Sequence, residues 1–185
     1  MNLSSLAPFF SGIQTPGLGP GPRHGVSPLP ALNRQLDEWL AASGLADARA
    51  ELLRASILLW HDHHNAAHGI VQDSETKDGS YIHAILHRRE PDYGNAKYWF
   101  HRVGKHACFI DLAERAAALL TAKDEAALAR KLNPNGTWDA LAFVDACDET
   151  GHEPDSTARS SLLRELQQIE FEVLVDYLAG QSSAT

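Results

Sequence analysis

The chain has only two cysteines among its 185 residues, and neither Cys108 nor Cys147 has the spacing of a metal-binding or redox motif. Two isolated thiols argue against a disulfide scaffold and favour a reducing compartment. Basic residues are also few, since 16 Lys and Arg stand against 24 Asp and Glu, for a formal net charge of -8. A general nucleic-acid binder needs a basic face, so the sequence predicts no nucleic-acid partner.

Long apolar runs are missing as well, and no stretch alternates between apolar and polar residues as a half-buried strand does. The first residues also lack the basic and apolar regions of a secretory signal. We therefore expect no membrane span, no membrane partner and a cytoplasmic protein. What the sequence does contain is 44% hydrophobic residues, enough to build the core of one domain.

Residues 1–30 are rich in Pro, Gly and Ser, as in TPGLGPGPRHGVSPLP from Thr15 to Pro30. This composition does not hold a regular helix and predicts an arm or linker. Phe9 and Phe10 can anchor the arm in a groove of its own domain or of a partner subunit, and a free tail is the other alternative. An arm on a helical body also favours a homodimer.

After the arm, apolar residues recur at helical spacing, and caps and breaks divide the chain into segments. The sequence predicts an all-α fold, a single-domain bundle of seven or eight helices over residues 31–180, followed by a tail at residues 181–185. The expected helices cover about residues 32–44, 47–72, 80–90, 92–104, 110–120, 121–132, 137–148 and 156–178.

The expected helix 47–72 carries a row of polar side chains beside its apolar face, which runs from Leu53 to Val71. Polar residues against a buried face are costly unless they bind one another or a ligand. A chain of hydrogen-bonded core histidines and a binding site are therefore the two alternatives. The row consists of His61, His64, Asn65, His68 and Gln72.

The next expected helix carries His83 and His87, which are four residues apart and share a face with Glu90. Packed antiparallel against helix 47–72, this pair is expected to meet the histidines of the polar row. Nitrogen ligands from two His-x-x-x-His pairs suit a divalent transition metal such as zinc, copper, nickel or iron(II). The predicted metal ligands are His61, His64, His68, His83 and His87.

Charged and polar residues elsewhere are candidates for catalysis and substrate binding. Glu170 lies within the apolar face of helix 156–178, where it either pairs with a buried Arg or His or acts as a ligand or general base. Arg88 and Arg89 can bind a carboxylate or phosphate of a substrate, or pair with acidic residues of this chain. Tyr98 also fits an ordinary buried aromatic face. The predicted catalytic residues are Glu170 and Arg88, and the predicted substrate-binding residues are Gln72, Arg89, Asn95, Lys97 and Tyr98.

The block GSYIHAILHRREPDYGNAKYWF, from Gly79 to Phe100, resembles the signature of a family of small all-helical proteins of bacteria and fungi with no established activity. The upstream Trp60-His-Asp and the pair His68 and Gln72 also fit the signature, so the resemblance covers about residues 56–106.

The chain departs from this signature at two positions. His101 stands where the family usually has Arg, and Ala107 where it usually has Pro. The resemblance implies a site around His68, His83 and His87, gives His64 less support, and implies no particular reaction.

Three functions follow from these patterns. The first is a metal-dependent hydrolase or lyase acting on a small polar or anionic molecule, with Glu170 moving protons. The second is a metal-free binding protein for a sugar or carboxylate ligand. The third is a structural or interaction module whose arm docks on a partner and whose histidines are merely paired.

Overall fold

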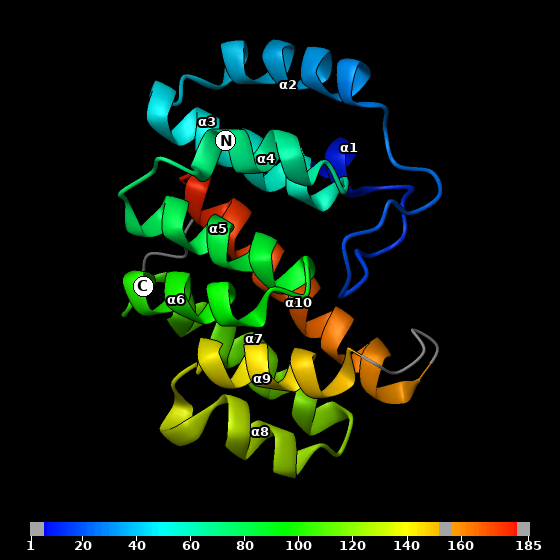
Figure 1. The fold of residues 1–185 in the computed structure, drawn as a ribbon, viewed down its shortest axis with the longest axis vertical. Helices are drawn as coiled ribbons and strands as arrows, with labels where there is room; N and C mark the ends of the chain where they lie inside the picture. The colour runs from blue at the N-terminus through cyan, green and yellow to red at the C-terminus, as the bar shows by residue number, and fades with distance from the viewer. Residues whose placement is uncertain (1–5, 152–156, 181–185) are drawn as a thin grey trace.

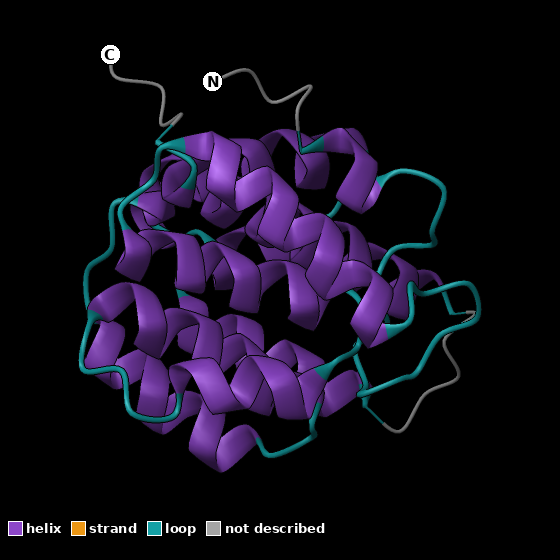
Figure 2. Cartoon of the chain, turned by 90° about the horizontal axis from the view of Figure 1, so that it is seen from above, coloured by secondary structure: helices purple, strands orange, loops and turns teal. Residues whose placement is uncertain are grey.

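The computed structural model describes residues 6–151 and 157–180, which form ten α-helices and a short 3-10 helix, with no strand among them (Figure 1, Figure 2). The predicted all-α class is confirmed, whereas seven or eight helices was too low a number. No helix in this part of the chain is both long and apolar enough to cross a bilayer. The helices are α1 (Ala7–Phe10), α2 (Leu29–Ser43), α3 (Asp47–Trp60), α4 (His64–Val71), α5 (Lys77–Arg89), α6 (Tyr93–Val103), α7 (Cys108–Ala122), α8 (Ala126–Leu132), α9 (Ala140–Thr150) and α10 (Ala158–Leu178), and the 3-10 helix is η2 (Pro134–Gly136).

Two differences from the sequence prediction account for the additional helices. The first is α1, a single turn inside the predicted arm. The second is a break at residues 61–63, which divides the expected helix 47–72 into α3 and α4. Asp62 has φ 62°, a left-handed conformation that a right-handed helix cannot continue. A helical wheel drawn across this break therefore assigns residues 61 and 72 to one face incorrectly.

The helices are stacked along the long axis of the molecule, with α2 at one end and α8 at the other (Figure 1). Between them lie α3 and α4, then α5, α6 and α9, while α10 packs against α3, α7 and α9. Every residue of α5 from Gly79 to Arg89 is buried. Because α5 is covered on all sides, each polar side chain on it needs a partner or a ligand.

The N-terminal segment packs against the helices of its own chain. Phe9 is buried and meets Trp39 edge to face at 6.4 Å between ring centroids, and Phe10 meets Trp60 at 5.1 Å. Leu18 is buried as well. Of the three alternatives for the arm, residues 6–28 therefore take the groove on their own domain. Residues 1–5 and the predicted tail at 181–185 lie outside the described residues.

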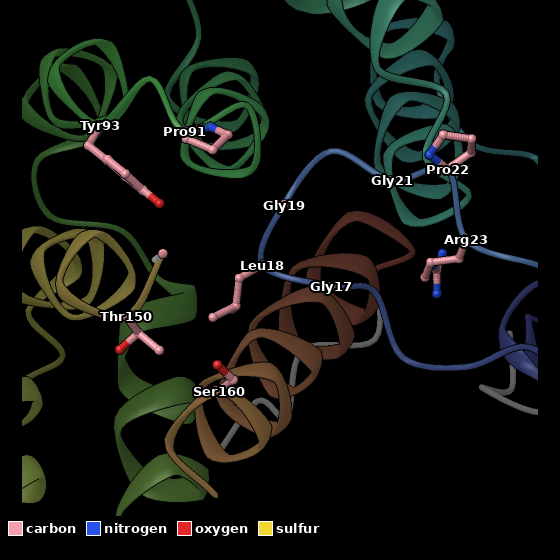
Figure 3. Close-up of a pocket in the computed structure, with 11 residues that line it drawn as sticks. Gly17, Leu18, Gly19, Gly21, Pro22, Arg23, Pro91, Tyr93, Thr150 and Ser160 are labelled. Carbon is pink, nitrogen blue, oxygen red and sulfur yellow. The ribbon is translucent and has the colours of Figure 1, made fainter. Parts of the chain in front are cut away.

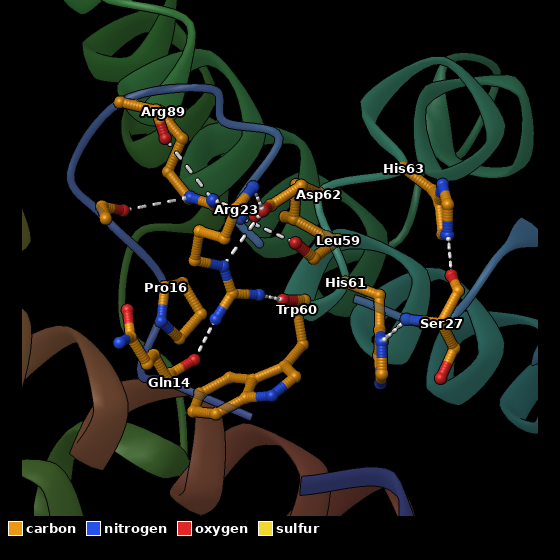
Figure 4. Close-up of polar contacts among 12 residues, drawn as sticks. Gln14, Pro16, Arg23, Ser27, Leu59, Trp60, His61, Asp62, His63 and Arg89 are labelled. Carbon is orange, nitrogen blue, oxygen red and sulfur yellow. Dashed lines mark hydrogen bonds and ion pairs between the residues drawn. The ribbon is translucent and has the colours of Figure 1, made fainter. Parts of the chain in front are cut away.

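A buried ion-pair network fastens this segment (Figure 4). The Asp62 carboxylate, whose side chain is fully buried, accepts hydrogen bonds from Arg23 Nε at 2.9 Å and Arg89 Nη2 at 2.6 Å. Arg89 also donates to the carbonyls of Gly17 and Gly19, both at 3.3 Å. Burial raises the pKa of Asp62, but the bonds from Arg23 and Arg89 outweigh burial and hold the pKa below its ordinary value. Asp62 thus links the arm to α5.

Candidate metal centre

Three of the five predicted ligands meet between α4 and α5. One ring nitrogen from each of His68, His83 and His87 lies within 4.8 Å of the other two. The His83 and His87 rings stack at 4.7 Å between centroids, and His68 stands nearly perpendicular to them at 4.8 Å and 5.8 Å. We call these residues the His triad. The helical spacing of four between His83 and His87 is what brings their rings to one side of α5.

The triad nitrogens are short of hydrogen bonds. Both ring nitrogens of His83 are buried and have no partner within the described residues, and the buried Nδ1 of His87 faces the Glu90 carboxylate without a hydrogen bond of good geometry. An unsatisfied buried polar atom costs about 1–3 kcal/mol, and a bound water or ion is the usual explanation for one in a native protein. These rings therefore do not form the chain of mutually hydrogen-bonded histidines that was the alternative to a binding site.

Two rings of the triad, His83 and His87, are held in the neutral form. Burial lowers the pKa of His83 to about 4, and the neighbouring His87 and His68 rings act in the same direction. Burial also lowers the pKa of His87, and the opposing effect of Glu90 does not cancel it. Neutral imidazole is the form that coordinates a metal ion.

Helix α6 covers one side of the triad. The Trp99 ring stacks on His83 at 4.0 Å between centroids, and Asn95 Nδ2 lies 3.1 Å from His87 Nε2. Tyr98 is 54% exposed and meets only the edge of Trp99, at 5.4 Å. Of the predicted substrate-binding residues on α6, Asn95 reaches the triad and Tyr98 stays on the surface.

Glu90 is the described carboxylate nearest to the triad. One of its carboxylate oxygens lies 3.3 Å from His87 Nδ1, and the other lies 3.8 Å from His64 Nδ1. Glu90 caps the C-terminal end of α5, three positions after His87, which is why it returns to the same face. The sequence analysis placed Glu90 on this face but did not select it as a site residue.

His61 is not part of the triad. It follows the last residue of α3, where Nε2 lies 2.8 Å from the Phe9 carbonyl and Nδ1 accepts from the Ser27 backbone N–H at 3.3 Å. Both nitrogens are thus used by the N-terminal segment. Burial lowers the pKa of His61. The prediction that His61 is a ligand is corrected by the break at Asp62, which separates His61 from α4.

We expect His61→Ala to destabilise the protein by about 1–2 kcal/mol at neutral pH, since two hydrogen bonds are lost. Because the folded-state pKa lies below the unfolded value of 6.5, the contribution of His61 is present above pH 6.5 and is lost as the pH falls toward the folded-state pKa. Urea unfolding should therefore show a stability difference between wild type and variant that narrows from about pH 7.5 to about pH 5.5. The other histidines are present in both proteins, so their contributions to the pH dependence of stability cancel in the difference. A constant difference contradicts the assignment.

His64 lies one turn before His68 on α4 but outside the triad. Its ring is buried, and neither nitrogen has a hydrogen bond of good geometry within the described residues. Burial, together with the positive charge of Arg89, lowers the pKa of His64 to about 4. His64 faces Glu90 rather than the other histidines, which corrects its prediction as a ligand.

Arg88 and Glu170 meet each other in the core instead of serving a substrate. Their side chains are 1% and 0% exposed, and Nη1 and Nη2 of Arg88 donate to the Glu170 carboxylate, Nη1 at 3.2 Å. Tyr81 Oη donates to the same carboxylate at 3.3 Å. Burial lowers the pKa of Arg88, but Glu170 outweighs it and raises the pKa above the ordinary value. The predicted catalytic pair therefore takes the alternative role, a buried ion pair.

The other predicted substrate-binding residues either pair with acidic residues of this chain or do not contact the triad. Arg89 belongs to the Asp62 network, and Lys97 forms an ion pair with Asp145 on α9. Gln72 is exposed beyond the end of α4. The predicted cations Arg88, Arg89 and Lys97 thus all have acidic partners, and none is left to bind an anionic substrate.

Two cavities lie near these elements. The first, of about 400 Å³, is formed by the Gly17–Gly21 loop with Tyr93, Thr150 and Ser160 (Figure 3). None of the described residues that line it is a histidine or a carboxylate. The second has about 450 Å³ and includes Glu90 and His64 in its wall. Only the second cavity therefore borders the triad through a titratable side chain.

Comparisons of the chain with protein-family models, with curated proteins and with solved structures find no match. The family resemblance of the signature block stays a prediction.

Proposed function

We propose that the protein is a metal-dependent enzyme, a hydrolase or lyase, which binds one divalent transition metal at the His triad and acts on a small polar molecule. The observation that supports this proposal is a set of three imidazoles whose ring nitrogens lie within 4.8 Å, with both nitrogens of buried His83 unpartnered among the described residues. Such rings are costly to maintain unless something occupies the space between them.

The geometry is close to that of a three-histidine metal site. Metal–nitrogen bonds of about 2.0–2.1 Å in a tetrahedral site place ligand nitrogens about 3.4 Å apart. The triad nitrogens therefore need to draw together slightly, which rotation of the side chains provides. Three protein ligands leave one position open, as in catalytic zinc sites, and an all-nitrogen set suits zinc, copper, nickel or iron(II). A metal held there would polarise a carbonyl or activate water.

Glu90 replaces Glu170 as the carboxylate of this site. Its oxygen lies 3.3 Å from His87 Nδ1, close enough to orient the ring of a metal ligand or to accept a proton near the open position. Asn95 approaches the other nitrogen of His87 and adds a hydrogen-bonding group to the wall. The chemistry of the proposed enzyme therefore involves His68, His83 and His87 as ligands and Glu90 as the acid–base or positioning group.

The alternative functions have less support. Binding of a carboxylate ligand lacks its cations, because Arg88, Arg89 and Lys97 pair with Glu170, Asp62 and Asp145. An interaction module would need an arm that is free to dock on a partner, whereas residues 6–28 pack against this chain. Binding of a neutral sugar without a metal, a homodimer and a cytoplasmic location stay predictions.

Replacing His83 and His87 together by alanine should abolish metal uptake and leave the helical content nearly intact. The two rings supply two of three ligands, and His83 contributes no hydrogen bond to the fold within the described residues. Elemental analysis of protein purified without a His-tag should find about one metal per wild-type chain and none in the variant, with circular dichroism as the check on folding. The exposed pair His24→Ala and His101→Ala is the matched control and should keep the metal. An unchanged metal content in the His83/His87 variant would refute the site.

A further inference from the structure

The 450 Å³ cavity beside the triad, which we call the Glu90 pocket, is lined by four apolar and five polar side chains. Its wall comes from the N-terminal segment, the residues just before α4, the start of α4 and the end of α5. The apolar residues are Pro20, Pro22, Leu29 and Ala66. Among the polar residues, Nε2 of His63 is taken by the Ser27 carbonyl and Asn65 is exposed, which leaves Asp62, His64 and Glu90.

Glu90 connects this pocket to the triad. It lines the pocket, and its carboxylate lies 3.3 Å from Nδ1 of His87. His64 lines the same wall one helical turn before the ligand His68. A molecule in contact with Glu90 and His64 is therefore next to the residues that would hold the metal.

His64 is the polar side chain of the pocket that is not satisfied by the described parts of the protein. The side chain is 9% exposed, and neither ring nitrogen has a hydrogen bond of good geometry. One imidazole nitrogen can donate and the other can accept, so the ring, turned toward the pocket, suits either a hydroxyl or an amine. The nearby Glu90 carboxylate adds acceptors only.

The charged groups that line the pocket favour a cation over an anion. None of the described residues that line it is Lys or Arg. Its other carboxylate, Asp62, is paired with Arg23 and Arg89, and neither guanidinium lines the pocket, so Glu90 is the charged group that a ligand there would touch. A negative ligand would meet Glu90 without a counter-ion, whereas an ammonium group would form a charge-assisted hydrogen bond with it.

We propose that the Glu90 pocket binds a small neutral or cationic molecule, with an apolar body against the prolines and Leu29 and an amine or hydroxyl at Glu90 and His64, and presents it to the His triad. This inference rests on the proposed metal site and narrows its substrate class from small polar molecules to amines and alcohols.

Three probes that share a ring and differ in head group test the charge preference. Benzylamine, benzyl alcohol and benzoate are titrated against the metal-free protein by ligand-observed NMR. Benzylamine should bind about tenfold more tightly than benzoate, with benzyl alcohol between them. Glu90→Gln should remove most of this preference. Glu75→Gln, which changes an exposed carboxylate on the loop after α4, should retain it. Equal binding of benzylamine and benzoate to wild type, or an unchanged preference in Glu90→Gln, overturns the inference.

His64→Leu tests the second polar group. It removes both ring nitrogens at similar volume and should weaken benzylamine and benzyl alcohol alike. Unaltered binding of both probes overturns the role of His64. Circular dichroism and the unfolding midpoint show whether each variant is folded.

Addition of Co²⁺ tests the position of the probe and separates this inference from the proposed function. Paramagnetic relaxation of the benzylamine protons should rise sharply with Co²⁺ at the triad and stay low in the His83/His87 double variant. Cobalt uptake without selective benzylamine binding overturns the pocket and leaves the metal site standing. Selective benzylamine binding without cobalt uptake supports the pocket and overturns the metal site. Cobalt uptake and probe binding without enhanced relaxation overturn the presentation of the ligand to the triad.

Discussion

Replacing Glu170 by alanine should destabilise the protein by roughly 3–5 kcal/mol, because it leaves the guanidinium of Arg88 buried without its counter-ion. Arg88 is 1% exposed and donates to both carboxylate oxygens of Glu170, and Tyr81 loses its acceptor as well. Urea unfolding followed by circular dichroism measures the loss.

A double replacement is the control for this prediction. Exchanging a buried ion pair for apolar residues of similar volume is often neutral or stabilising. Arg88→Met combined with Glu170→Leu should therefore recover most of the stability lost in Glu170→Ala. Near wild-type stability of Glu170→Ala itself would count against the ion pair as a structural element and would reopen Glu170 as a catalytic residue.

Replacing Asp62 by alanine should cost a similar amount, roughly 3–5 kcal/mol, and should also release the N-terminal segment. Asp62 is the shared acceptor of Arg23 and Arg89, so its loss leaves two guanidinium groups facing each other. Of these two arginines, only Arg23 lies on the arm, and its side chain is 11% exposed in the wild type. Trypsin should therefore cleave after Arg23 much faster in the variant, and urea unfolding should report the loss of stability.

Asp73→Ala is the matched control for Asp62→Ala, because Asp73 is an exposed aspartate on the loop just after α4. It should leave both the cleavage rate and the unfolding midpoint within experimental error of wild type. If Asp62→Ala resists trypsin as well as the control does, the ion-pair network does not fasten the arm.

The part of the site that lies within one helix could be predicted from the sequence. His83 and His87 share a face because their spacing is set by the helix itself, and the same holds for Glu90 three positions later. His68 was correctly placed near His83 and His87, because it lies on α4, after the break at residues 61–63. His61 was misassigned because the left-handed conformation of Asp62 depends on bonds to Arg23 and Arg89, which are distant in the sequence.

In the core as well, contacts between residues distant in the sequence could not be predicted from the sequence. Periodicity placed Glu170 on the buried face of α10, which the structure confirms. It could not choose between a base and an ion pair, because the deciding contact with Arg88 spans 82 positions. The place of the arm could not be chosen among its alternatives for a related reason. Its Pro and Gly content excludes a long helix but says nothing of the carbonyl groups of Gly17 and Gly19, which accept from Arg89.

Three consecutive residues of α5 serve three different structures, since His87 joins the triad, Arg88 the core ion pair and Arg89 the Asp62 network. We therefore expect this one turn of helix to couple the proposed metal site thermodynamically to the anchorage of the N-terminus. A cation that binds the folded triad adds its binding free energy to the folded state. Through α5, filling the triad should also suppress the local openings that free the arm, so that loading with metal and resistance of the arm to proteases rise together.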